Sequence, residues 1–291
     1  MLYIILMEDL NLHNNVGLIN FGNTCFMNSS IQLLMSASVF CMHLISNEEL
    51  LNTDAKKYIK TIKDYMHPKT SILGPKLLHS SYMKLNLLYT GYTQEDSHEY
   101  IVYTLDDILT IIKSLPSEHD DFIRRACNMV TFTLNTSVTY KKDNTVSNSS
   151  NRDCVLLLPI NKRDSTLHGC LELFSNVDEQ DKTITYSLSD MPKYLFISLK
   201  RFIKNGTTHE KNTDLIDIPL TTEIFGTKYK LKSFVNHMGS ISGGHYVAYS
   251  VRKINGEYLW FCYNDSNVSP ENIDNISNIA KQSYVFLYSR I

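Results

Sequence analysis

The sequence predicts an α+β fold, with helices in the first part of the chain and strands after them. Between about residues 28 and 115, apolar residues recur at helical spacing, as in Ile101, Leu105 and Ile108, which share one face. From about residue 130 onward, short runs rich in β-branched and aromatic residues dominate. Helices followed by strands, rather than alternating with them, favour α+β over a doubly wound α/β fold.

Composition supports a folded protein and narrows its partners. The chain has 291 residues, of which 43% are hydrophobic and 11% aromatic, enough apolar material for a substantial core. The formal net charge is −2, so we expect no nucleic-acid partner. The apolar run over residues 1–7 is too short to span a bilayer and lacks the features of a signal peptide. We therefore expect an intracellular protein, cytoplasmic or nuclear, with no membrane association.

Two helix starts can be placed from capping patterns. Cys25 follows turn-prone residues and precedes a helical pattern, with Asn23 or Thr24 as the N-cap. For the second helix, Thr93 with Asp96 three residues later forms a capping-box pattern.

The later elements are predicted to be strands joined by polar segments. The expected strands cover residues 154–160, 183–188, 194–199, 245–252, 258–263 and 284–289. Residues 141–153 (KKDNTVSNSSNRD) are polar and show no periodicity, which predicts a mobile loop.

The position of Cys25 at a helix start suggests a chemical role. Unpaired backbone N–H groups and the positive end of the helix dipole stabilise a thiolate, the form in which cysteine acts as a nucleophile. The alternative is that Cys25 is a small buried hydrophobic residue, as most free cysteines are. None of the six cysteines forms a CxxC pair, which argues against a disulfide framework and against a four-thiolate zinc site.

A partner for Cys25 is suggested by the hairpin signal Asn255-Gly256, which lies between two strand patterns. A two-residue turn there puts Asn264 on the same face as His245, at a diagonal position, and Asp265 on the other face. A β-bulge would exchange Asn264 and Asp265, and His245 could also be an ordinary hydrogen-bonded sheet residue. Cys25, His245 and Asn264 together match the nucleophile, base and orienting group of a thiol hydrolase.

Four segments resemble the motifs of the ubiquitin-specific proteases, in the order of that family and over nearly the whole chain. GLINFGNTCFMNSSIQLL resembles the cysteine box, and GGHYVAYSV with WFCYNDSNV and SYVFLY resembles the histidine box. QEDSHEY resembles the family's helix signature, and MPKYLFISLKRF resembles its palm strand. The resemblance implies a single, minimal papain-like catalytic domain over residues 1–291. Its expected parts are an α-rich thumb (about 14–125), a reduced β fingers insertion (126–190) and a β palm (191–291).

The resemblance also implies an activity and roles for the site residues. The protein would be a monomeric deubiquitinating thiol protease, without a cofactor, that hydrolyses the isopeptide bond after the C-terminal glycine of ubiquitin in ubiquitinated proteins. Cys25 would be the nucleophile, His245 the base and Asn264 the orienting residue. Asn20 would donate to the oxyanion, whereas without the resemblance it would be interpreted as a loop residue that caps its own turn. Asp265 would have a supporting role.

Residues around the second helix are implied in binding the C-terminal tail of ubiquitin. Asp96 and Glu99 lie three apart at its start, beside Gln94, and carboxylates there would pair with arginines of the tail. The alternative is that Asp96 and Glu99 only compensate the helix dipole.

The glycine-rich segment before His245 is the other part of the implied tail site. Residues 239–244 are predicted to be a mobile loop that covers the tail, and Gly243, Gly244 and Tyr246 would line it. His237 also fits the motif, without a role that the sequence explains.

One departure from the family pattern affects substrate binding. Many members carry two CxxC pairs in the fingers that hold a structural zinc, but no such pair occurs here. The sequence therefore predicts a shortened fingers region without metal. Two alternatives to a deubiquitinase stay open: a ubiquitin-binding pseudoenzyme and a protease for a ubiquitin-like modifier.

Overall fold

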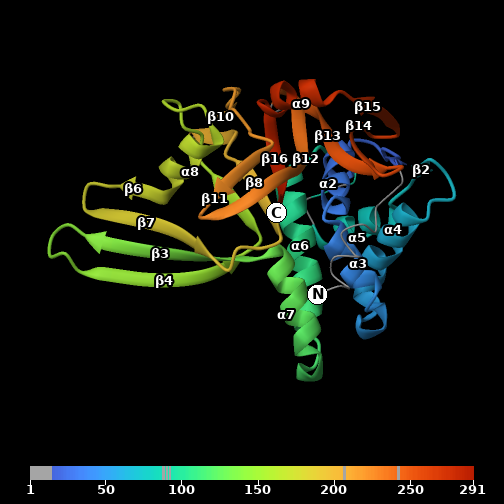
Figure 1. The fold of residues 1–291 in the computed structure, drawn as a ribbon, viewed down its shortest axis with the longest axis horizontal. Coiled ribbons are helices and arrows are strands. Elements are labelled where there is room, and N and C mark those ends of the chain that lie inside the picture. The colour runs from blue at the N-terminus through green and yellow to red at the C-terminus, as the bar shows by residue number, and fades with distance from the viewer. Residues whose placement is uncertain (1–14, 87–88, 90, 92, 206–207, 241–242) are drawn as a thin grey trace.

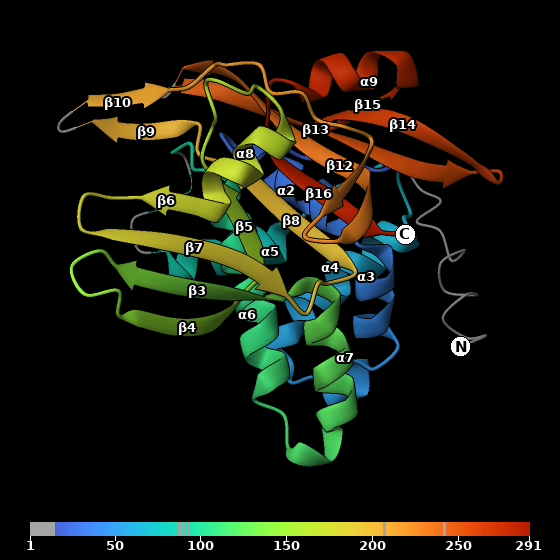
Figure 2. The same ribbon diagram turned by 60° about the vertical axis from the view of Figure 1, so that its left-hand side comes forward.

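The computed structural model describes residues 15–86, 89, 91, 93–205, 208–240 and 243–291. It confirms the α+β class: a layer of helices packs against a large sheet, and a smaller sheet projects to one side (Figures 1 and 2). The apolar run over residues 1–7 lies outside the described residues.

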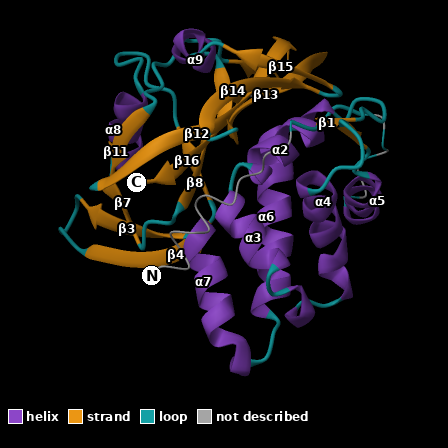
Figure 3. Ribbon diagram, turned by 45° about the vertical axis from the view of Figure 1, so that its right-hand side comes forward, coloured by secondary structure: helices purple, strands orange, loops and turns teal. Residues whose placement is uncertain are grey.

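The helical layer is built around one completely buried helix. Its helices are α2 (Cys25–Met35), α3 (Ser38–Ile45), α4 (Lys56–Met66), α5 (Lys76–Leu85), α6 (Ser97–Lys113) and α7 (Asp120–Val130), with the short 3-10 helices η1 (Glu48–Leu50), η2 (Thr53–Ala55) and η3 (Ser117–His119). Every residue of α2 is buried, between α6 and the large sheet (Figure 3). Within the described part of the chain, no single helix is long and apolar enough to cross a membrane; α2 and α3 pass that test only as a pair, bent by 84°.

The large sheet carries most of the C-terminal part of the chain. Its strands are β5 (Val155–Leu158), β8 (Tyr194–Leu199), β11 (Thr221–Ile224), β12 (Thr227–Ser240), β13 (Gly243–Ile254), β14 (Glu257–Asn264), β15 (Asn267–Glu271) and β16 (Ser283–Arg290). The order is β15-β14-β13-β12-β16-β8-β5, with β11 paired to β12, and only the β5–β8 pair is parallel. All six predicted strands are present, and each lies in or overlaps an observed strand.

Small pairs of strands complete the sheet structure. The parallel pair is β1 (Gly17–Leu18) with β2 (Ile72–Leu73), and the antiparallel pair is β9 (Phe202–Asn205) with β10 (Thr208–Lys211).

The hairpin between β13 and β14 forms as predicted. Asn255 and Gly256 both have positive φ, 51° and 90°, which is the requirement of a type I′ turn. The register runs from Ile254 opposite Glu257 to Ala248 opposite Tyr263 without a bulge.

The smaller sheet corrects one prediction. Its order is β4-β3-β7-β6, with β3 (Phe132–Tyr140), β4 (Val146–Asp153), β6 (Asn176–Asp178) and β7 (Lys182–Ser189). The expected loop over residues 141–153 is wrong from Val146 onward, where the chain forms the edge strand β4. Every β4 residue is exposed, so no apolar alternation marks this strand. Its pairing with β3 determines its conformation instead.

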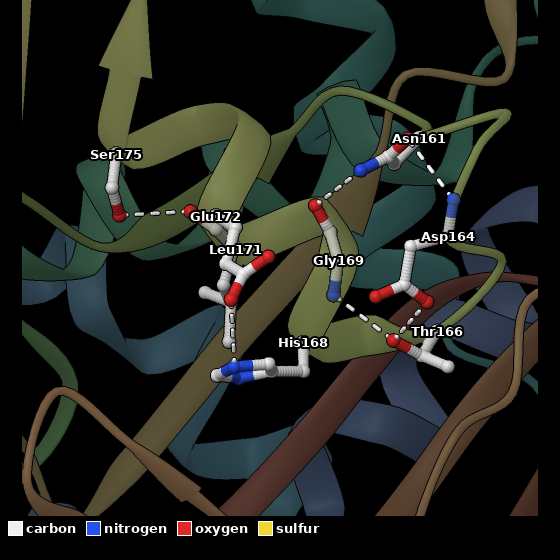
Figure 4. A network of polar contacts seen from close by, with 8 residues as sticks. All are labelled: Asn161, Asp164, Thr166, His168, Gly169, Leu171, Glu172 and Ser175. Carbon is white, nitrogen blue, oxygen red and sulfur yellow. Dashed lines mark hydrogen bonds and ion pairs between the residues drawn. The ribbon is translucent and has the colours of Figure 1, made fainter.

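Helices α8 (Leu167–Ser175) and α9 (Ile273–Ala280) were not predicted. The start of α8 is built by local polar contacts (Figure 4). Thr166 Oγ1 accepts a hydrogen bond from Gly169 N (3.0 Å), and Asn161 Nδ2 donates to Gly169 O (3.0 Å). A Cβ at Gly169 would lie 2.5 Å from the Asp164 carboxyl carbon, so the close approach requires glycine.

The start of α6 and the end of the β12–β13 hairpin also differ from the sequence-based expectation. Asp96, not Thr93, is the N-cap of α6; its carboxylate accepts from His98 N at 2.7 Å, so the capping box is wrong. The expected loop over residues 239–244 is wrong for its described residues, because Gly239 pairs with Gly244 and Ser240 with Gly243 as strand ends. Residues 241–242 lie outside the described residues.

Candidate active site

Cys25 is the first residue of α2, as the sequence predicted, and Thr24 is the N-cap. Thr24 does not cap with its side chain. Its hydroxyl accepts from Phe21 N (2.9 Å), and its own N–H donates to Asn20 Oδ1 (3.0 Å). The turn before Cys25 is thereby closed on itself, and Gly22 supplies its positive φ of 101°.

The electrostatics of Cys25 differ from the expectation of a stabilised thiolate. Burial raises the pKa of the thiol, and the negative charge of Asp265 raises it further, whereas backbone hydrogen bonds from Tyr246 and Phe26 lower it. The helix-start amides act in the predicted direction, but burial outweighs them. In the free protein Cys25 is therefore a thiol that needs a base. Its hydrogen bond with the backbone of Tyr246 places it beside the residue that follows His245 in the chain.

His245 and Asn264 form a direct pair at the neighbouring ends of β13 and β14. His245 Nε2 lies 2.7 Å from Asn264 Oδ1. The hairpin register predicts this pairing, and no bulge exchanges Asn264 with Asp265. Since an amide oxygen only accepts, Nε2 carries the proton in this pair, and Nδ1 of the neutral ring is free to act as a base.

Asp265 belongs to a second group of polar residues, which does not include His245 or Asn264. Its Oδ2 accepts from Asn20 Nδ2 (2.8 Å) and its Oδ1 from Asn28 Nδ2 (2.8 Å). Its backbone has a positive φ of 50°, and its carbonyl accepts from Leu18 N (2.8 Å). Asn28 was not predicted from the sequence; the available signal was a polar residue one turn after Cys25, near the start of the same helix.

Gln94 connects the segment before α6 to the start of β13. Its Oε1 accepts from Gly244 N (2.8 Å), and its Nε2 donates to the carbonyl of the same residue. Beneath Gly244 lies the ring of His237, whose Nε2 would be 2.1 Å from a Cβ at position 244. Burial, with the nearby charges of Lys211 and His245, lowers the pKa of His237 to about 4, so this ring is neutral at physiological pH.

The carboxylates of Asp96 and Glu99 are in different situations. Asp96 accepts from Tyr284 OH (2.7 Å) and caps α6, and burial raises its pKa. Glu99 is exposed, and partial desolvation together with Asp96 and Glu95 raises its pKa. Asp96 thus has internal partners, which supports the capping alternative, whereas Glu99 faces solvent.

The remaining predicted site residues, Gly243, Gly244 and Tyr246, lie beside His245 at the start of β13. Gly243 and Gly244 begin β13, and Tyr246 is buried, with its ring 4.5 Å from that of His237. Within the described ranges, no three His, Cys, Asp or Glu side chains are grouped to hold a metal ion. The absence of zinc stays a prediction.

Comparison with known proteins bears on this arrangement. The sequence model of the family described as ubiquitin carboxyl-terminal hydrolase matches residues 16–288, which include both polar groups and Cys25. The chain belongs to the ubiquitin carboxyl-terminal hydrolase family. It is similar to ubiquitin carboxyl-terminal hydrolase 2 of Bos taurus, with 26% identity covering 94% of this chain and 54% of that protein. It is equally similar to ubiquitin carboxyl-terminal hydrolase 8 of Saccharomyces cerevisiae, with 26% identity covering 94% and 70%.

Among solved structures, the hydrolase fold recurs in Ubp8 of the SAGA DUB module bound to monoubiquitin. That structure aligns with a TM-score of 0.82 and 23% identity, covering 97% of this chain and 70% of Ubp8. It shows a common fold. The chain spans about half the length of the mammalian relatives it matches.

Proposed function

We propose that this hydrolase is a deubiquitinating cysteine protease that cleaves the peptide or isopeptide bond after the C-terminal glycine of ubiquitin. The observation that carries the proposal is the arrangement around Cys25. A cysteine at a helix start contacts the backbone next to His245, and His245 is held by Asn264 at 2.7 Å. Family membership supplies the substrate class.

The proposed reaction has two steps. His245 takes the proton of Cys25, and the thiolate forms a C–S bond to the carbonyl carbon while the carbonyl π electrons move to oxygen. When the tetrahedral intermediate collapses, the C–N bond breaks and the amine leaves with the proton from His245. Water then attacks the thioester, with His245 as base, and the thiolate leaves with release of the ubiquitin carboxylate. Because burial raises the pKa of Cys25, proton transfer to His245 is a required part of the first step.

Asn20 is the proposed side-chain donor to the oxyanion. Its amide has two N–H groups, of which one donates to Asp265 at 2.8 Å, and the other remains available for the oxyanion beside the Cys25 N–H. Asn20 Oδ1 accepts from Thr24, so the amide orientation is fixed at both ends. A donor held in place before the reaction stabilises the oxyanion without reorganisation.

For the tail of ubiquitin, we propose that Glu99 pairs with its arginines while Asp96 adds negative charge behind it. Gln94 would hold the start of β13 through Gly244, and Gly243 and Tyr246 would line the tail site. The exposure of Glu99 and the internal bonding of Asp96 support this division. The tail would be recognised through charge pairing with its arginines and through contacts with its backbone.

The test is capture by ubiquitin that carries a C-terminal electrophile, together with turnover of a fluorogenic ubiquitin amide. We expect one covalent adduct at Cys25, and Cys25→Ala should abolish both capture and turnover while retaining ubiquitin binding. Cys262→Ser is the matched control, since Cys262 is the cysteine that is not fully buried, and it should keep wild-type turnover. Binding without capture would indicate a ubiquitin-binding pseudoenzyme. Capture only by a probe made from a ubiquitin-like modifier would indicate a protease for that modifier.

A further inference from the structure

Asn28 is a buried amide whose orientation is fixed by its surroundings. Asn28 is only 2% exposed. Its Nδ2 lies 2.8 Å from Asp265 Oδ1, 3.4 Å from Leu18 O and 3.3 Å from Ile19 O. All three neighbours are acceptors, so a flipped amide would put its oxygen against three oxygens. Asn28 therefore acts as a hydrogen-bond donor at this place.

Stability alone does not account for an asparagine here. Asn28 Oδ1 is buried and has no hydrogen-bond partner among the described residues. A buried acceptor left without a partner costs free energy of folding, and a leucine of similar shape would avoid that cost. The unsatisfied oxygen is tolerated on the helix that carries Cys25, one turn away from it.

The donor group of Asn28 is the first of three linked contacts. Asn28 Nδ2 donates to Asp265 Oδ1, and Asn20 Nδ2 donates to Asp265 Oδ2. Thr24 N donates to Asn20 Oδ1. We infer that Asn28 is a positioning residue for the reaction: it fixes the Asp265 carboxylate, which in turn fixes the Asn20 amide that faces the oxyanion. This inference rests on the proposed function.

Gln32, one turn further along α2, provides a matched control. It is also buried, 1% exposed, and its Nε2 donates to Val16 O at 2.7 Å. Its Oε1 accepts from Tyr65 OH at 2.5 Å, so both ends of this amide are bonded within the core. None of these contacts involves Asn20 or Asp265. Gln32 thus represents a buried amide of the same helix with a structural role.

The experiment compares Asn28→Leu with Gln32→Leu in two reactions of the same protein. Turnover of a fluorogenic ubiquitin amide passes through an oxyanion, whereas alkylation of Cys25 by iodoacetamide is a displacement at carbon and forms none. We expect Asn28→Leu to lower kcat about 10- to 100-fold, somewhat less than complete loss of an oxyanion donor. KM and the Cys25 alkylation rate, followed by mass spectrometry, should stay within about threefold. Gln32→Leu should lower Tm but leave kcat within about threefold.

A charge exchange gives a second readout that does not depend on filling the core. Asn28→Asp alone sets two carboxylates against each other and should lose more activity than Asn28→Leu. Adding Asp265→Asn removes the repulsion between the two carboxylates, but the new carboxylate at position 28 still faces the carbonyls of Leu18 and Ile19, so only part of the lost activity should return.

Each outcome bears on a specific claim. Unchanged kcat in Asn28→Leu, or parallel loss of kcat and alkylation, would overturn the positioning role. If wild-type protein turns over the substrate, those failures concern Asn28 only. If wild-type protein fails to react with ubiquitin at all, the proposed function is overturned, and the inference with it.

Discussion

The polar residues of the candidate site form two groups, and these are built differently. The first, His245 with Asn264, consists of a single cross-strand pair at the ends of β13 and β14. The second consists of Asn20, Asp265 and Asn28, which come from three separate segments and share one carboxylate. Asn264 and Asp265 are adjacent in sequence but serve different groups.

The difference shows how one turn can supply two functions. Asn264 is the last residue of a regular strand, so its direction follows from the hairpin register. Asp265 has a positive φ, which turns its side chain away from that strand and towards α2. In the proposed mechanism the first group serves the base and the second serves the oxyanion. The separation of the two groups can be tested.

The largest effect is expected from combining changes in the two groups. Asn264→Ala and Asp265→Ala should each lower kcat about 100-fold, by misorienting His245 and Asn20 respectively. If the groups act independently, the double variant should lose about 10,000-fold. Asp265→Ala with Asn20→Ala should be far less than additive, because both act on the same donor. Steady-state kcat values distinguish independent from coupled groups. If Asn264→Ala with Asp265→Ala is no worse than either single variant, the two groups form one unit.

A smaller effect is expected from disturbing the segment before His245 alone. Gly244→Ala would bring a Cβ to 2.1 Å from His237 Nε2 and 2.4 Å from Met238 O. The strand must shift next to His245, so kcat should fall about tenfold and stability by about 1–3 kcal/mol.

Gly243→Ala is the matched control for stability, because no described atom lies within 4 Å of the added methyl group, and its Tm should not change. The alkylation rate of Cys25 in an Asn264→Ala background would show whether Gly244→Ala acts through the base. Equal loss of Tm in both glycine variants would contradict a steric conflict between the added methyl group and His237 beneath Gly244.

The smallest effect is expected outside both groups, at the carboxylates near α6. Glu99→Gln should raise KM for a ubiquitin substrate a few-fold without changing Tm, since Glu99 is exposed. Asp96→Asn should mainly lower Tm, because Asp96 accepts from Tyr284 and His98.

The pH dependence provides a second check on Glu99. Its pKa is raised, so on acidification it loses its charge at a higher pH than an ordinary glutamate. KM of the wild-type protein should therefore rise as the pH falls toward 5, and that of Glu99→Gln should rise less. An unchanged KM in Glu99→Gln, with a lower Tm, would leave only the helix-dipole explanation.

The sequence by itself determined the features that depend on local chemistry. Asn255-Gly256 specifies its turn through positive φ at both residues, and the period of two then brings Asn264 to His245. The helix start at Cys25 and five strands of the large sheet, β5, β8, β13, β14 and β16, also follow from local patterns. These features needed no information from distant parts of the chain.

Only the tertiary structure decided the features that depend on burial and on distant partners. β4 has no apolar face, so its pairing with β3 makes it a strand. The pKa of Cys25 is raised because the packed protein surrounds the thiol, which outweighs the helix-start effect visible in sequence. Asn28 meets Asp265 across 237 residues, and no spacing rule reaches that far. Local geometry is encoded in neighbouring residues, whereas desolvation and long-range hydrogen bonds exist only once the chain is packed.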